Sequence, residues 1–163
     1  MLAESFRGVN VYDLALSDTP GEASFHQVIS NPDYSGFRRR EYPRQHETIE
    51  LVQVKTELLD RVIPESLPVP FIKIDVEGAE LQVLRGAVNT IGKNKPIIVF
   101  EHGLGAADYY GIAPEEVYDL LTAQCGLYVS LMDSWLKGNN PLRREEFADQ
   151  FYRGTNYMFV AHP

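Results

Sequence analysis

FIKIDVEGAE, at residues 71–80, decides the fold of this sequence. The stretch begins in a short apolar run with β-branched residues, which is typical of a strand buried on both faces, and we predict a strand over residues 69–74. Two carboxylates, Asp75 and Glu77, follow the strand directly. We therefore predict a buried strand that ends in an acidic turn.

A helix is predicted after this turn. Apolar residues recur at spacings of three and four from Leu81 to Ile91, the period of one helix face, and Gly92 and Pro96 predict its end. A second apolar run at 96–101 predicts another strand. The order of strand, helix and strand continues from there along the chain.

The flanking sequence adds further predicted elements. Alternating or β-branched patterns predict the other strands, and a polar stretch with two prolines predicts a loop. Helices are predicted where apolar residues recur beside start and stop signals. The strands are placed at 10–16, 22–29, 49–54, 127–132 and 156–161, the loop at 31–48, and the helices at 57–62 and from Pro114 to Gly126.

Alternating strands and helices imply parallel strands joined by right-handed crossovers. In such sheets ligands bind beyond the carboxyl ends of the strands. This rule places Asp75 and Glu77 on the ligand side after one strand, and Glu101 and His102 on the same side after the next. The four side chains are therefore the candidate site.

These residues permit two interpretations. Asp75 and Glu77 are able to bind a cation, orient an amine or accept a proton from a hydroxyl, but carboxylates here also stabilise the N-terminus of a following helix. Glu80 is interpreted as a first-turn helix residue. His102 is a candidate general base, although a lone histidine is more often structural. A hydrolase built on Asp75 and Glu77 is a further alternative.

Composition excludes several classes of protein. The 163 residues suffice for one domain, and the net charge of −8 argues against a nucleic-acid-binding surface. The single cysteine, Cys125, excludes an internal disulfide and a cysteine-built zinc site, and it favours the cytoplasm. No apolar run is long enough to span a bilayer, and the histidines have no partners at ligand spacing, so we expect neither a membrane-bound protein nor a metal site.

The run at 71–80, continued by Leu81 and by VLRGA at 83–87, resembles the signature of the FkbM methyltransferases. Residues 15–18 and 96–102 resemble that family's third and fifth strands. The resemblance implies an α/β fold with a Rossmann-like class I methyltransferase sheet. It also implies one partial domain over residues 1–163, with a variable insert at 31–48.

The same resemblance implies transfer of a methyl group from S-adenosylmethionine, most often to a hydroxyl on a small molecule or sugar. Asp75 is expected to face the methionine end of the cofactor, with Glu77, Glu101 or His102 as the base. Leu16 is expected near the adenine through its backbone N–H. Such a protein would bind a small-molecule substrate and no nucleic acid.

Two features of the family have no counterpart in this sequence. Its glycine-rich cofactor loop follows the first strand, and an acidic residue follows the second. We therefore expect the first two strands of the family's fold to be absent. The isolated chain should then bind the cofactor very weakly. The alternative function is a catalytically inactive binding or structural module. We also expect the strand around Ile72 to have a free edge through which the chain forms homo-oligomers, unless another segment or a rearranged N-terminal region covers it.

Two further motifs permit alternatives. Arg38, Arg39 and Arg40 either bind an acidic substrate or form a solvated loop. GLGAAD at 103–108 half-matches a dinucleotide-binding fingerprint but lacks its third glycine. We interpret it as a loop beside the mouth of the active site.

Overall fold

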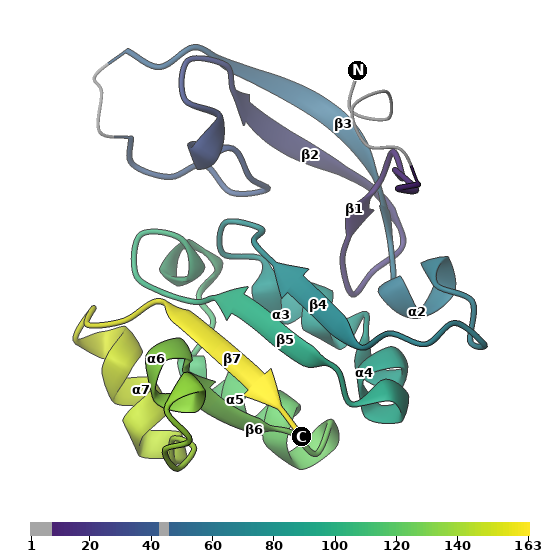
Figure 1. The fold of residues 1–163 in the computed structure, drawn as a ribbon. Helices are drawn as coiled ribbons and strands as arrows, with labels where there is room; N and C mark the ends of the chain where they lie inside the picture. Colours follow the sequence, from purple (N-terminus) through teal and green to yellow (C-terminus); the bar gives the residue numbers. More distant parts are fainter. Residues whose placement is uncertain (1–7, 43–45) are drawn as a thin grey trace.

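The computed structural model describes residues 8–42 and 46–163, which form a mixed α/β protein with two separate sheets (Figure 1). One sheet has three strands from the N-terminal third of the chain, and the other has four strands from the remainder. The three-stranded sheet lies across the end of the four-stranded sheet towards which β4 and β5 point (Figure 1). The α/β class is confirmed, although the described strands form two sheets where one sheet was predicted.

The three-stranded sheet contains β1 (Ala15–Leu16), β2 (Gly21–Val28) and β3 (Ile49–Glu57) in the order β1-β3-β2. β2 pairs with β3 antiparallel, and β1 pairs with β3 parallel. The predicted strand at 10–16 is therefore only two residues long, whereas β3 extends past its predicted end. Between β2 and β3 the polar segment includes a single 3₁₀ turn, η1 (Pro32–Tyr34).

The four-stranded sheet contains β4 (Phe71–Ile74), β5 (Ile97–Glu101), β6 (Tyr128–Leu131) and β7 (Met158–His162). Its order is β4-β5-β7-β6, with β4 and β5 parallel and β7 antiparallel to both neighbours. β4, β5 and β6 therefore run in one direction. The predicted parallel pair is confirmed, and the carboxyl ends of β4 and β5 lie at the same edge of the sheet.

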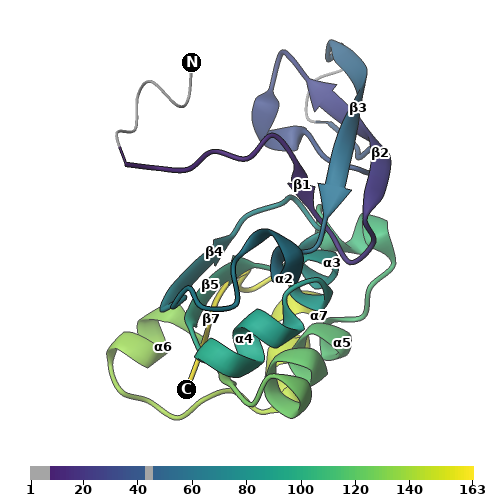
Figure 2. The same cartoon turned by 90° about the vertical axis from the view of Figure 1, so that its right-hand side faces the viewer.

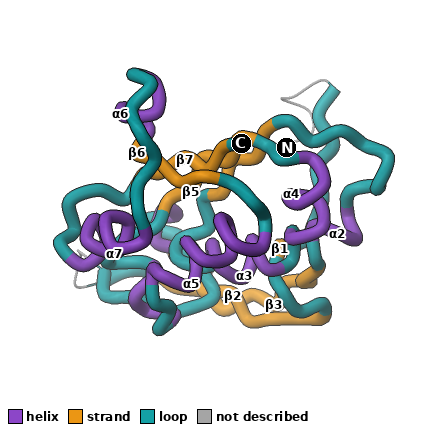
Figure 3. Tube along the Cα trace, turned by 90° about the horizontal axis from the view of Figure 1, so that it is seen from below, coloured by secondary structure: helices purple, strands orange, loops and turns teal. Residues whose placement is uncertain are grey.

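Helices cover mainly one face of this sheet. Figures 2 and 3 show α3, α5 and α7 on one side and α6 on the other. The main core lies under the first group, where Ile98 and Phe100 of β5 pack with Leu81 and Leu84. The helices are α2 (Leu59–Val62), α3 (Glu80–Arg85), α4 (Val88–Asn94), the 3₁₀ turn η2 (Ala107–Tyr110), α5 (Pro114–Asp119), the π-helical η3 (Leu120–Gln124), α6 (Met132–Leu136) and α7 (Arg144–Tyr152).

The helix predicted after Gly78 is in fact two helices. Gly86 separates α3 from α4 because the turn after β1 approaches it closely: a Cβ on Gly86 would lie 2.1 Å from the carbonyl oxygen of Ser17. Gly92 does not end the helix as predicted but lies inside α4, which ends at Lys95 in a left-handed conformation. Tertiary contact, rather than local helix propensity, sets this break.

β4 differs from its prediction in burial. Ile74 is buried, but Phe71 and Lys73 are exposed, so β4 is not buried on both faces. The reason is its position, because β5 is the only strand that pairs with β4 in the described part of the chain. A mainly apolar groove of about 300 Å³ runs beside this edge, lined by Leu16, Ile72 and Val76 among others.

No helix in the described ranges combines the length and apolar character needed to cross a membrane.

Candidate functional site

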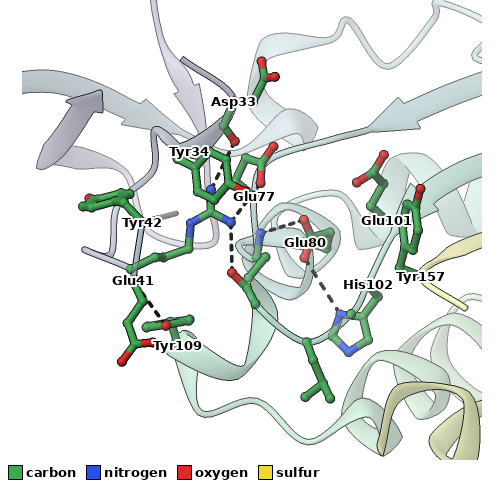
Figure 4. Close-up of a pocket in the computed structure, with 16 residues that line it drawn as sticks. Asp33, Tyr34, Glu41, Tyr42, Glu77, Glu80, Glu101, His102, Tyr109 and Tyr157 are labelled. Carbon is green, nitrogen blue, oxygen red and sulfur yellow. Dashed lines mark hydrogen bonds and ion pairs between the residues drawn. The ribbon is translucent and has the colours of Figure 1, made fainter. Parts of the chain in front are cut away.

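A polar cavity of about 720 Å³ opens where β4 and β5 end (Figure 4). It contains three of the four side chains predicted to lie together, Glu77, Glu101 and His102, and Asp75 is not among its lining residues. We call it the glutamate pocket. Its other lining residues are Asp33, Tyr34, Arg40, Glu41, Tyr42, Gly78, Glu80, Gly103, Leu104, Gly105, Ala106, Tyr109 and Tyr157.

The turn after β4 holds an unusual backbone conformation. Glu77 has φ +55° and Gly78 has φ +104°, a region that side-chain-bearing residues rarely adopt. Gly78 also lies against the loop after β5, because a Cβ on it would stand 2.5 Å from the carbonyl oxygen of Ala106. Only glycine fits this position. The close packing fixes the direction of the neighbouring Glu77 side chain.

Glu77 is paired with a residue from the insert. Nη1 of Arg40 lies 3.0 Å from Oε2 of Glu77 and 3.2 Å from the carbonyl oxygen of Gly105, and Nη2 donates to the carbonyl oxygen of Asp33. The guanidinium also lies over the Tyr34 ring, 5.2 Å from its centroid. Arg40 is buried and contacts its partners through both terminal nitrogens, while its Nε has no hydrogen-bond partner among the described residues; Arg38 and Arg39 are exposed. The three arginines therefore do not act as one anion-binding patch, and Arg40 instead attaches the insert to the pocket.

Glu80 and His102 form a buried pair at the base of the pocket. Each is 1% exposed, and Oε2 of Glu80 lies 3.8 Å from Nδ1 of His102. Oε1 of Glu80 accepts the N–H of Gly78 at 2.9 Å. Oε2 of Glu80 and both imidazole nitrogens have no hydrogen-bond partner among the residues that the structure describes. Phe147 and Phe151 of α7 stack on the His102 ring. Glu80 is in the first turn of its helix as predicted, and it also lines the pocket.

Asp33 and Glu41 are exposed in the insert wall of the pocket, whereas Glu101 is a partly accessible carboxylate of the four-stranded sheet. It ends β5, is half-buried and has no ion-pair partner in the described part of the chain. Burial raises the pKa of Glu101, and the negative charges of Asp75 and Glu77 raise it further. Burial likewise raises the pKa of Glu77, although the Arg40 guanidinium opposes this. The pocket thus holds carboxylates whose charged form is disfavoured without a cation.

Tyrosines and the loop after β5 complete the walls. Tyr34 and Tyr42 come from the insert and meet edge to face at 6.2 Å, and Tyr109 accepts the N–H of Glu41 through its hydroxyl. Residues 103–106 line the pocket, which places the glycine-rich segment beside the mouth, as interpreted from the sequence. No helix for phosphate binding follows it directly, because η2 is a single 3₁₀ turn.

The two residues assigned to the cofactor lie outside this pocket. Asp75 is exposed and its carboxylate accepts Nζ of Lys73 at 2.5 Å. Lys73 therefore pairs with a carboxylate, and its own side chain is exposed. Leu16 lies in the other sheet and lines the apolar groove beside β4, which shares no lining residue with the glutamate pocket. Asp75 itself lines neither cavity, although its chain neighbours Ile74 and Val76 line the groove together with Leu16.

Metal ligands do not gather in the described ranges, where no group of three histidine, cysteine, aspartate or glutamate side chains has the geometry to hold an ion. Independently of this, carboxylates such as those in the pocket are able to accept a proton or to pair with an organic cation.

Two groups in the site were missed from the sequence. Arg40 lay in a segment interpreted as a loop, and its contacts 65 residues away have no local signal. A local signal did exist for Phe147 and Phe151, because these aromatic residues are four positions apart and follow the acidic first turn of α7. That helix was not predicted, nor was α6.

The fold and site define an α/β protein with an acidic ligand pocket at the carboxyl ends of two parallel strands. Residues 3–128 match the sequence model of the methyltransferase FkbM domain. This match covers most of the chain, which therefore belongs to the FkbM methyltransferase family.

Two other comparisons add little to this assignment. A crystal structure of methyltransferase FkbM from Methylobacillus flagellatus KT has 16% sequence identity and a TM-score of 0.40, over 68% of this chain and 24% of that one. The chain thus spans about a quarter of that protein's length. No curated protein matches the sequence.

Proposed function

We propose that this chain provides the acceptor pocket of an S-adenosylmethionine-dependent methyltransferase that methylates a hydroxyl on a small molecule or sugar. Family membership supports methyl transfer as the reaction. The observation that carries the proposal is the position of Glu101 at the carboxyl end of β5, inside a cavity large enough for a small acceptor. Its carboxylate has a raised pKa and no ion-pair partner among residues 8–42 and 46–163.

Glu101 is the proposed base. A hydroxyl is a weak nucleophile until its proton is removed, and a carboxylate of raised pKa accepts that proton more readily than an ordinary one. Glu77 is less available, because Arg40 holds its Oε2 at 3.0 Å. We propose that Glu77 attaches the insert and that Glu101 accepts the proton of the hydroxyl.

His102 and Glu80 have a supporting role in this proposal. Their burial leaves His102 less open to the acceptor than Glu101. An imidazole nitrogen that faces the pocket is still able to hydrogen-bond a second hydroxyl and align the first. His102 is therefore proposed as a positioning residue and Asp75, paired with Lys73 outside the pocket, is not assigned a step.

The α/β class is observed, and we propose that the four-stranded sheet is part of a Rossmann-like sheet. Its three co-directional strands and the site at their carboxyl ends support this.

Methyl transfer is tested with the whole chain and S-adenosylmethionine carrying a tritiated methyl group. The cofactor is supplied at millimolar concentration, since we expect weak binding, together with a panel of monosaccharides and amino sugars. The expected result is label in a product with an O-methyl signal by NMR. Absence of label above a protein-free control across the panel would overturn the proposal.

A further inference from the structure

The glutamate pocket has a strong excess of negative charge. Five carboxyl-bearing side chains line it, against one guanidinium. That guanidinium is already committed, because Arg40 contacts Glu77, Gly105 and Asp33. The charge left for a ligand is therefore negative, and a ligand with a phosphate or carboxylate would meet repulsion.

The pocket also lacks partners for buried hydrogen-bonding atoms. Within the described part of the chain, Oε2 of Glu80 is an acceptor without a donor, and His102 has no partner on either ring nitrogen although it is 1% exposed. Native proteins rarely leave such groups unsatisfied. Because a carboxylate only accepts hydrogen bonds, the missing partner of Glu80 has to be a donor.

Aromatic rings supply a third feature. Tyr34, Tyr42, Tyr109 and Tyr157 line the cavity, and one of these rings already carries a cation, since the Arg40 guanidinium lies over Tyr34. Tyrosine faces suit the apolar C–H faces of a sugar ring, and carboxylates suit its hydroxyls. The walls therefore match a hydroxyl-rich compound that carries positive charge.

We infer that the acceptor is an amine-bearing, hydroxyl-rich small molecule of the amino-sugar type, whose ammonium group binds among Glu101, Glu80 and His102. This inference rests on the proposed function, because it identifies the glutamate pocket as the acceptor site. It adds that a positive charge on the acceptor is required for recognition. The insert at 31–48, which contributes Tyr34, Tyr42 and Arg40, determines specificity at this site.

Binding is tested without catalysis by saturation-transfer and titration NMR on the whole chain. Three probes share one ring and differ in charge: glucosamine is cationic, N-acetylglucosamine is neutral and glucuronate is anionic. We expect glucosamine to bind about tenfold more tightly than N-acetylglucosamine, and glucuronate not to bind. Equal binding of the first two sugars, or tighter binding of glucuronate, would overturn the inference.

Two variants and one control locate the cation. Glu101→Gln removes the unpaired carboxylate, and Glu41→Gln removes an exposed charge from the insert wall. The first is expected to abolish the preference for glucosamine and the second to reduce it. The control Glu65→Gln changes a side chain that is 92% exposed and outside this pocket, and it should alter nothing. A preference that survives Glu101→Gln contradicts the proposed place of the ammonium group.

Competition separates the acceptor from the cofactor, which also carries an ammonium group. If S-adenosylmethionine displaces glucosamine competitively, the pocket binds the cofactor and the inference is wrong. Independent binding supports it. A failure to bind glucosamine would leave methyl transfer to other hydroxyls unaffected, so failure of this inference is distinct from failure of the proposed function.

Discussion

Oε2 of Glu80 lies 3.8 Å from Nδ1 of His102, and both side chains are almost fully buried. The two residues come from different elements, since Glu80 begins α3 and His102 follows β5. Glu80 also accepts the N–H of Gly78 through its other oxygen. The two side chains bring the acidic turn after β4 and the end of β5 together at the base of the glutamate pocket.

Glu80→Ala is expected to destabilise the protein by about 1–3 kcal/mol, because it leaves the Gly78 N–H without its acceptor in a buried position. Glu80→Gln retains an amide oxygen that accepts this hydrogen bond, so its free energy of unfolding should decrease less. Urea unfolding measures both. Equal free energies of unfolding for the two variants would contradict the role assigned to the bond.

Arg40→Met is expected to lower the free energy of unfolding by about 2 kcal/mol or more, since it leaves Glu77 without its cation and two carbonyls without a donor. The matched control is Arg39→Met, because Arg39 is the neighbouring residue of the same run and is exposed. Its change should stay within about 0.5 kcal/mol. If thermal and urea unfolding give equal losses for the two variants, Arg40 does not attach the insert.

Gly78→Ala is expected to cost more than about 2 kcal/mol, because its φ is +104° and the new Cβ would meet the Ala106 carbonyl at 2.5 Å. Gly92→Ala is the opposite control. It lies inside α4 with open space at the Cβ position, so it should stabilise the protein by about 0.5–1 kcal/mol. Opposite signs in the shift of the melting temperature are the expected observation, and a neutral Gly78→Ala would refute the close packing.

The edge of β4 that no described strand pairs with predicts self-association with a second copy of the chain. Phe71 on this strand is 55% exposed beside the apolar groove, and an uncovered strand edge promotes pairing between chains. Phe71→Glu should shift a concentration-dependent dimer to monomer in size-exclusion chromatography with light scattering. Leu136→Glu, at a position that is 70% exposed on α6, is the control and should leave the dimer intact. A monomer for the unaltered chain at every concentration would contradict this prediction.

Local patterns in the sequence predicted much of the fold. β4, β5 and their parallel pairing follow from two apolar runs that flank a helical repeat, and the carboxyl-end rule brought Glu77, Glu101 and His102 together. The two strands and their order were predicted because apolar runs and helical spacing are local properties of the sequence. The second sheet was not predicted, because strand pairing between distant segments has no local signal.

The remaining differences have tertiary causes. Gly86 breaks the predicted helix because the Ser17 carbonyl approaches it. Asp75 forms an ion pair with Lys73, whose side chain is exposed on β4. Arg40 could not be separated from its two arginine neighbours by sequence, since only its burial distinguishes it. The contribution of the insert to the pocket was therefore visible only in three dimensions.

The most direct test of the central claim is the pH dependence of methyl transfer by the whole chain and by Glu101→Gln at saturating cofactor. Because the pKa of Glu101 is raised above 4.5, the fraction of Glu101 able to accept a proton increases as the pH rises through this higher value. We predict that the rate rises over the same range, that Glu101→Gln loses both the rise and most of the rate, and that Glu65→Gln keeps both. A Glu101→Gln variant with an unchanged rate and pH profile would contradict the account.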